Sequence, residues 1–152
     1  MPAAIEVRDL VRTYGDTRAV DGVSFTVEPG EVFAILGPNG AGKSTTVEIL
    51  EGHRTRTSGE VEVLGVDPAR GGRAFRDRIG VVLQSSGIDR ELTAREVLDL
   101  YGAAYSKRRP VDEVLELVEL SEKADSRVGS LSGGQQRRLD VALGLIGDPE
   151  LI

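Results

Sequence analysis

The chain has 152 residues, of which 39% are hydrophobic and 29% are charged, with a formal net charge of −6 and no cysteine. This length and composition are typical of a folded globular protein. The acidic balance argues against a dedicated nucleic-acid binder, and the lack of cysteine excludes disulfides and thiolate metal sites. No apolar run approaches the roughly 20 residues that span a bilayer, and the N-terminus lacks a secretory signal, so we expect a cytoplasmic location.

The first half of the chain alternates short strand patterns with one helix. Ile5–Arg8 and Val23–Val27 alternate apolar and polar residues as half-buried strands do. The unbroken apolar run Val32–Leu36 predicts a buried parallel strand. Thr45–Leu50 then predicts a helix, and Glu60–Val63 another short strand. Early antiparallel strands that lead into a parallel strand indicate a mixed α/β fold.

The second half is predicted to be mainly helical. Ile79–Leu83 is a second apolar run with the pattern of a buried strand. Thr93 and Glu96 then form a capping-box pattern at the start of an amphipathic helix, and another helix follows. We expect a single domain over residues 1–152, with a helical lobe inserted at approximately residues 88–130.

A glycine-rich segment between the strand and the helix matches the phosphate-loop pattern G-x-x-x-x-G-K-[ST]. Its glycines let the main chain wrap around an anion, and the helix N-terminus adds positive potential. Lys43 brings a charge to the outer phosphates, and the Ser44 hydroxyl is a ligand for Mg²⁺. An ordinary glycine turn is the alternative, which the Lys43-Ser44 pair disfavours. The candidate nucleotide-binding residues are Gly37, Asn39, Gly40, Ala41, Gly42, Lys43, Ser44 and Thr45.

A second helix N-terminus in the chain also has the features of an anion site. Leu131–Gln135 opens a third helix, in which Ser132 and Gln135 fit a capping box, and that structural role alone would explain them. The functional interpretation is that Gly133 and Gly134 expose amides to another anion. Two phosphate-binding helix starts are explained if the second one faces a nucleotide held by another copy of the domain.

These motifs together resemble the ATP-binding cassette (ABC) family, specifically the ATPase subunit of a transporter. They stand in the family order: the aromatic Tyr14, the phosphate loop Gly37–Thr45, Gln84 at the end of the second apolar run, and the signature Leu131–Gln135. The phosphate loop alone is common to many nucleotidases, whereas the signature is specific to this family. The resemblance implies a P-loop NTPase core with an N-terminal antiparallel subdomain and a helical signature lobe.

The resemblance also implies roles for the site residues, with ATP and Mg²⁺ as cofactors. Tyr14 would stack on adenine, although a partly exposed aromatic near a turn is the alternative. Gln84 would contact Mg²⁺ or the attacking water, although it fits a polar strand end as well. Ser44 and Gln84 would be the metal contacts. Ser132, Gly133, Gly134 and Gln135 would close over the γ-phosphate bound by the opposite subunit.

The implied function is to couple ATP binding and hydrolysis to export across a membrane. The partners would be a transmembrane permease and a second ABC subunit, either identical or paired, with no nucleic acid. Contact with the cytoplasmic face of the membrane would be made only through the permease. Val47–Gly52 and Thr57–Pro68 resemble drug-export ATPases of bacterial antibiotic-resistance systems. A non-transport ABC ATPase is the alternative.

The family's catalytic Asp-Glu pair and switch histidine find no match in the sequence and are expected beyond Ile152. Asp148-Pro149 does not replace the acidic strand, because this pair is typical of a helix end followed by a turn. We therefore expect a chain that lacks the last strands of the fold, binds ATP without its catalytic carboxylates, and exposes an apolar edge at Val32–Leu36. A nucleotide-binding fragment without turnover stays open as an alternative function.

Overall fold

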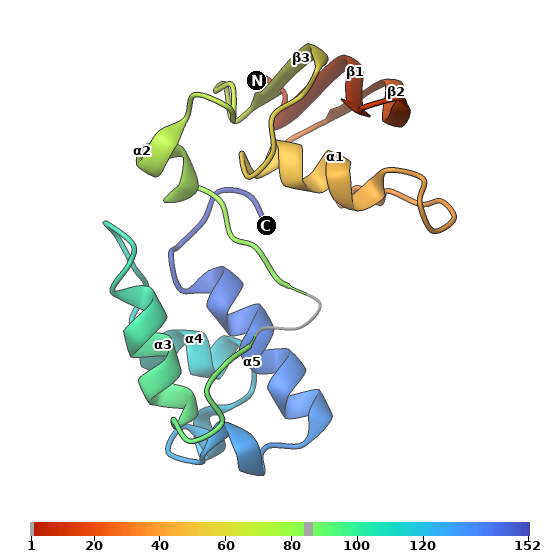
Figure 1. Ribbon diagram of the computed structural model, residues 1–152. Coiled ribbons are helices and arrows are strands. Elements are labelled where there is room, and N and C mark those ends of the chain that lie inside the picture. Colours follow the sequence, from red (N-terminus) through yellow and green to blue (C-terminus); the bar gives the residue numbers. More distant parts are fainter. Residues whose placement is uncertain (1, 84–86) are drawn as a thin grey trace. The chain divides into compact units, whose positions relative to one another are not determined.

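The computed structural model describes residues 2–83 and 87–152 (Figure 1). The chain forms two compact units, Met1–Phe75 and Arg76–Ile152. Each unit has buried hydrophobic residues of its own. The first unit carries the phosphate loop, and the second carries the signature helix.

The first unit is built on a three-stranded antiparallel sheet in the order β2-β1-β3. The strands are β1 (Ile5–Tyr14), β2 (Thr17–Val27) and β3 (Ser58–Val63). The expected antiparallel subdomain is therefore confirmed, but β1 runs well beyond its predicted end at Arg8. Asp9 lies at a register irregularity with φ 48°, and its N–H donates to Ser24 Oγ at 2.8 Å. This bulge interrupts the alternation of apolar and polar residues, which is why the sequence pattern stops early.

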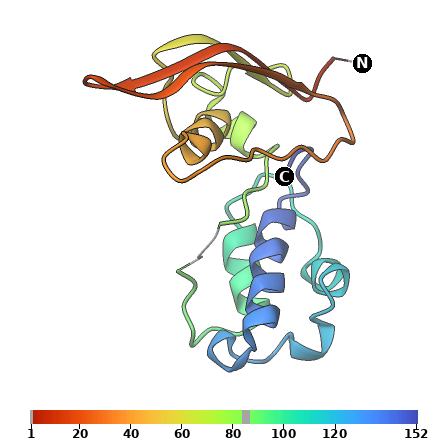
Figure 2. The same ribbon diagram turned by 90° about the vertical axis from the view of Figure 1, so that its right-hand side faces the viewer.

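Helix α1 (Lys43–Leu50) packs against one face of this sheet (Figure 2). Its buried side chains are Thr46 and Ile49. Gly52, with φ 76°, follows the helix, and its N–H donates to Ile49 O at 3.1 Å. The short helix α2 (Gly72–Arg76) adds the buried ring of Phe75. The hydrophobic core of the unit consists of Ile5, Val7, Leu10, Val20, Val27, Ile49, Val61, Val63 and Phe75.

A bidentate ion pair joins the loop before β3 to the loop after it. Arg56 Nη1 and Nη2 donate to the two carboxylate oxygens of Asp67, each at 2.8 Å. Both side chains are partly buried, and Asp67 Oδ1 also accepts from the Ala69 N–H at 3.0 Å. The hydrogen bonds from Arg56 are the main reason why the pKa of Asp67 lies below its usual value.

This ion pair makes the stability of the first unit dependent on pH. Because the pKa of Asp67 is lower in the folded state, its stabilising contribution is complete above the unfolded pKa, near 3.8, and is lost as the pH falls through the folded pKa. We expect D67N to lower the free energy of unfolding at pH 7 by about 1–2 kcal/mol. Urea titrations of the parent and D67N should show a smaller difference in the free energy of unfolding at pH 3 than at pH 7. An equal difference at both pH values would contradict the prediction.

The second unit is a helical bundle. Its elements are α3 (Ala94–Gly102), α4 (Val111–Leu117), the 3-10 turns η1 (Ser121–Lys123) and η2 (Val128–Ser130), and α5 (Gly133–Leu145). Thr93 and Glu96 form both bonds of the predicted capping box, and Pro110 precedes the first turn of α4. Fully buried side chains from three helices meet in the core, among them Val97, Leu98, Val114, Leu115, Leu139 and Ala142.

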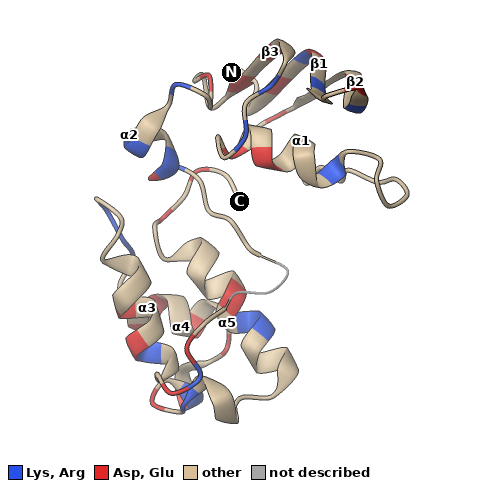
Figure 3. Ribbon diagram, in the orientation of Figure 1, with Lys and Arg blue, Asp and Glu red and all other residues tan. Residues whose placement is uncertain are grey.

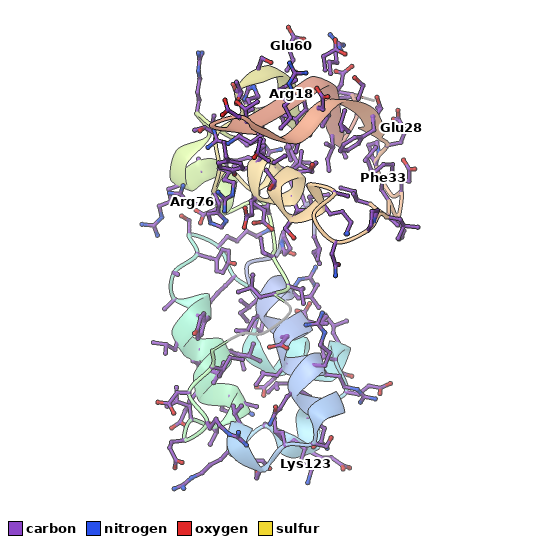
Figure 4. All side chains as sticks on the ribbon, turned by 45° about the vertical axis from the view of Figure 1, so that its right-hand side comes forward. Arg18, Glu28, Phe33, Glu60, Arg76 and Lys123 are labelled. Carbon is purple, nitrogen blue, oxygen red and sulfur yellow. The ribbon has the colours of Figure 1, made fainter. Side chains whose placement is uncertain are left out.

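The apolar run Val32–Leu36 forms no strand within residues 2–83 and 87–152, so the prediction of a buried parallel strand is wrong here. Val32 is 98% exposed and Leu36 is 88% exposed. Only Phe33 finds an aromatic partner, because its ring stacks on Phe25 with centroids 5.0 Å apart (Figure 4). A strand is stable only where its backbone groups pair with a neighbour, and no described segment pairs with this run.

The second apolar run, Ile79–Leu83, is also not a continuous strand. Ile79 forms a single parallel bridge with Leu151, and the Gly80 N–H donates to Leu151 O at 2.8 Å. Gly80 also lies directly against α5, where a Cβ would be 2.0 Å from Gly144 O. The prediction of a buried strand over Ile79–Leu83 is therefore wrong beyond the start of this run.

Asp148 terminates α5, as the sequence pattern predicts. It follows the end of the helix with φ 51° and makes ion pairs with Lys107 at 2.7 Å and with Arg109 at 2.8 Å. These two cations, Lys107 first, hold the pKa of Asp148 below its usual range. The carboxylate thus holds the loop between α3 and α4 against the end of α5.

Candidate nucleotide-binding site

The phosphate loop links the extended segment 32–36 to the first turn of α1. Gly40 and Gly42 both have φ 82°, a left-handed conformation that disfavours residues with a Cβ. Gly42 is also packed tightly, because a Cβ there would be 2.1 Å from Ala19 O on β2. At Gly40 a Cβ would meet no atom within 4 Å. The loop is therefore fixed to the sheet at one glycine and open at the other.

Lys43 folds back over this loop. Its Nζ donates to Gly37 O at 2.6 Å and to Pro38 O at 2.7 Å. An ammonium group has three donors, so these two bonds orient it and leave the third for a ligand. The Ala41 N–H donates to Pro38 O at 3.2 Å and closes a turn inside the loop.

The first turn of α1 presents hydroxyl and amide groups beside the lysine. Ser44 is exposed and Thr45 is half-buried, whereas Thr46 points inward and is only 4% exposed. Thr46 Oγ1 donates to Gly42 O at 2.9 Å, and the Thr46 N–H donates to the same oxygen at 2.9 Å. First-turn amides of a helix have no acceptor within the helix. Those amides, the Ser44 hydroxyl and the Lys43 ammonium suit a phosphate chain that carries Mg²⁺.

Tyr14 lies at the end of the hairpin that contacts this loop. It pairs with Thr17 at the start of β2, the strand whose Ala19 carbonyl faces Gly42. Tyr14 is 39% exposed.

Two arginines surround the Tyr14 ring. The Arg12 guanidinium lies over the ring, 4.5 Å from its centroid, and Arg54 Nη1 donates to the hydroxyl at 2.8 Å. Interaction with Arg12, followed by the positive charge of Arg54, lowers the pKa of the Tyr14 hydroxyl.

The signature segment forms the predicted helix N-terminus in the second unit. Ser132 Oγ accepts from the Gln135 N–H at 3.3 Å, and Gln135 Oε1 accepts from the Ser132 N–H at 2.9 Å. Gly133 and Gly134 are exposed, and a Cβ on either would meet nothing within 4 Å. The capping box is confirmed, and the glycine face beside it is open to a ligand. Gln84, the predicted water and Mg²⁺ contact, lies outside the described residues.

The ABC transporter family profile matches residues 20–152 of this chain. The chain belongs to the ABC transporter family, as a nucleotide-binding domain. The match includes the phosphate loop and the signature helix and begins after Tyr14.

The curated relatives are ATP-binding components of exporters. Nod factor export ATP-binding protein I of Rhizobium meliloti (strain 1021) is 46% identical over 154 residues, covering 98% of this chain and 46% of that protein. The protein of that name in Paraburkholderia xenovorans (strain LB400) is 43% identical over 155 residues, covering 99% of this chain and 51% of that protein. The chain thus spans about half the length of the curated relatives that it matches.

Solved structures of the family confirm the fold class. cbiO1 from Clostridium perfringens, part of the ABC transporter complex cbiONQ, has a TM-score of 0.86 and 29% identity, covering 98% of this chain and 63% of that chain. An ATP-binding cassette of an ABC transporter in its ADP conformation has a TM-score of 0.85 and 26% identity, covering 98% of this chain and 66% of that chain. Within the described part of this ABC chain, none of the helices could span a bilayer.

The sequence pattern missed three residues that shape the site. The phosphate-loop pattern does not include Thr46, although a threonine four residues after Gly42 is well placed to donate a hydrogen bond to the Gly42 carbonyl. Arg12 stands two positions before Tyr14 on β1, and this period of two puts both side chains on one face of the strand. Arg54 reaches Tyr14 from the loop after α1, a long-range contact that no local pattern encodes.

Proposed function

We propose that this ABC chain binds ATP together with Mg²⁺ at Gly37–Thr45, as the nucleotide-binding part of an exporter. The observation that carries the proposal is the loop geometry: Gly42 is fixed against Ala19 O, and the Lys43 ammonium is oriented by two loop carbonyls. A loop built in this way provides backbone amides and one cation for a phosphate chain before the ligand arrives.

The identity of the nucleotide follows from Tyr14. The phosphate loop recognises only the triphosphate, whereas the exposed part of the Tyr14 ring offers a flat surface for a purine base. The Ser44 hydroxyl would supply one ligand for Mg²⁺. Gln84 is proposed as a further contact to Mg²⁺ or to the attacking water.

ATP hydrolysis is proposed as the activity of the intact ABC domain. Phosphoryl transfer depends on positioning and on electrostatic stabilisation of charge on the transferred group. Here Lys43 and the first-turn amides of α1 would hold the β- and γ-phosphates, while the bound metal neutralises part of their charge. Ser132, Gly133 and Gly134 would approach the γ-phosphate from a second subunit, since the open amides of α5 suit an anion.

The proposed partners are a second ABC subunit and a transmembrane permease at the cytoplasmic face of the membrane. The names of the curated relatives, which refer to Nod factor export, support export as the direction of transport. The closer resemblance to drug exporters stays a prediction. Basic and acidic residues are mixed along both units, as Figure 3 shows, and this mixing supports a protein partner rather than nucleic acid.

Equilibrium binding to a nucleotide series tests the proposed site. Calorimetric titration with ATP, ADP and AMP, each with and without Mg²⁺, should give the tightest binding for ATP with Mg²⁺ and no measurable binding for AMP. The ranking is expected because most of the affinity comes from the β- and γ-phosphates. Equal affinity for ATP and AMP would contradict the proposed site.

Ser132→Arg tests the proposed role of the signature helix in a second subunit. The substitution should leave the affinity for ATP within about twofold, because Ser132 is not part of the phosphate loop, but weaken ATP-dependent dimerisation at least about tenfold by burying an unpaired charge. Sedimentation with and without ATP measures this.

Ser132→Ala is the matched control for that experiment. It removes the helix cap, worth about 1 kcal/mol, without adding bulk or charge. It should therefore keep ATP-dependent dimerisation. Dimerisation of Ser132→Arg at the level of the parent would exclude the signature helix from the subunit contact.

A further inference from the structure

Tyr14 contacts two arginine side chains, and stacking on a base does not by itself require these contacts. The Arg12 guanidinium covers one face of the ring at 4.5 Å from the centroid. Arg54 holds the hydroxyl at 2.8 Å and is itself paired with the Glu48 carboxylate on α1. The Arg54 guanidinium also lies over the ring, 5.6 Å from its centroid, so two arginines hold Tyr14.

Arg12 is itself anchored by a contact outside the Tyr14 ring. Its Nη1 donates to Thr55 Oγ1 at 3.3 Å, and its Nε is buried without a hydrogen-bond partner in the described part of the chain. Arg12 is half-buried, whereas Tyr14 is exposed.

We propose that Arg12 is a positioning residue for the nucleotide base, holding the Tyr14 ring in place so that the exposed part of this residue stacks on the base. A planar cation over an aromatic face is attracted by the electron density of the ring, and it limits the rotation of the side chain. A ring fixed in its binding orientation loses less conformational entropy when the base arrives. This inference rests on the proposed function, because it requires a nucleotide at the phosphate loop.

The contribution of Arg12 can be separated from that of the loop with a ligand that has no base. Tripolyphosphate with Mg²⁺ occupies the phosphate loop but has nothing to stack on Tyr14. We expect Arg12→Ala to weaken binding of ATP about three- to fivefold and to leave binding of tripolyphosphate unchanged. Arg12→Lys, which keeps the charge but loses the planar group, should lie between the parent and Arg12→Ala.

A double-mutant cycle shows whether Arg12 acts through the ring. Tyr14→Ala should weaken binding of ATP about tenfold, and Arg12→Ala should have no further effect in that background. Arg8→Ala is the matched control: it removes the same charge from the same strand, where Arg8 pairs with Glu6 and Glu60. Binding of both ligands to Arg8→Ala should equal binding to the parent.

Calorimetry on the parent and these variants decides the proposal. The proposal is supported if Arg12→Ala weakens binding of ATP but not of tripolyphosphate, and if Arg12→Ala has no effect in the Tyr14→Ala background. Equal weakening for ATP and tripolyphosphate, unchanged or tighter ATP binding in Arg12→Ala, or independent effects in the cycle would overturn it. If the parent binds neither ligand, the proposed function itself fails; if it binds both equally, only the base site fails.

Discussion

Lys43→Ala is expected to weaken ATP binding by at least about 100-fold. The ammonium group is the one side-chain cation of the loop, and a charge-assisted bond to phosphate is among the strongest that a side chain makes. The substitution also removes two hydrogen bonds to Gly37 O and Pro38 O, which orient the loop. Calorimetric titration of ATP with Mg²⁺ into the parent and the variant measures the difference.

Two further variants show that the loss belongs to the ammonium group. Lys43→Met keeps an unbranched apolar stem and removes only the donors, so it should lose as much affinity as Lys43→Ala. Lys123→Ala removes an exposed lysine from η1 in the second unit, labelled in Figure 4, and should bind ATP like the parent. Equal affinity in the parent and in Lys43→Ala would show that the loop is not the phosphate site.

Gly42→Ala is expected to have the largest effect on the folding of the loop. The added Cβ would be placed 2.1 Å from Ala19 O, a backbone atom that cannot move without disturbing β2. The backbone φ of 82° adds strain of about 1 kcal/mol for any residue with a Cβ. Together these effects should lower the free energy of unfolding by about 2–4 kcal/mol and abolish ATP binding.

Gly40→Ala is the matched control for this clash. Gly40 has the same φ of 82°, but a Cβ there would meet no atom within 4 Å. Only the strain of about 1 kcal/mol should remain. Urea denaturation of the two variants compares them directly, and equal stability would show that the contact with Ala19 O has no energetic weight.

Local motifs in the sequence predicted much of the candidate site. The phosphate loop at Gly37–Thr45 and the helix cap at Ser132 are formed by residues that are neighbours in the chain. A fixed spacing in the sequence is therefore enough to recognise these two motifs. The two capping boxes formed as predicted for the same reason. The family profile then confirmed that these motifs belong to an ABC transporter chain.

Features that depend on distant partners were not predicted correctly. An apolar run such as Val32–Leu36 has the composition of a buried strand, but a strand also requires a hydrogen-bonded neighbour. The bulge at Asp9 interrupts the alternation of apolar and polar residues, although β1 continues to Tyr14. Arg54 reaches Tyr14 across 40 positions of the chain, and no periodicity signals such a contact.

The proposed site depends most on the backbone amides of the phosphate loop, and nuclear magnetic resonance of the ¹⁵N-labelled chain observes them directly. Addition of ATP with Mg²⁺ should produce its largest amide shifts at Gly40, Gly42, Lys43 and Ser44, saturating with one nucleotide per chain, and Lys43→Ala should abolish them. Shifts that leave these four amides unchanged while others move would contradict the proposed site.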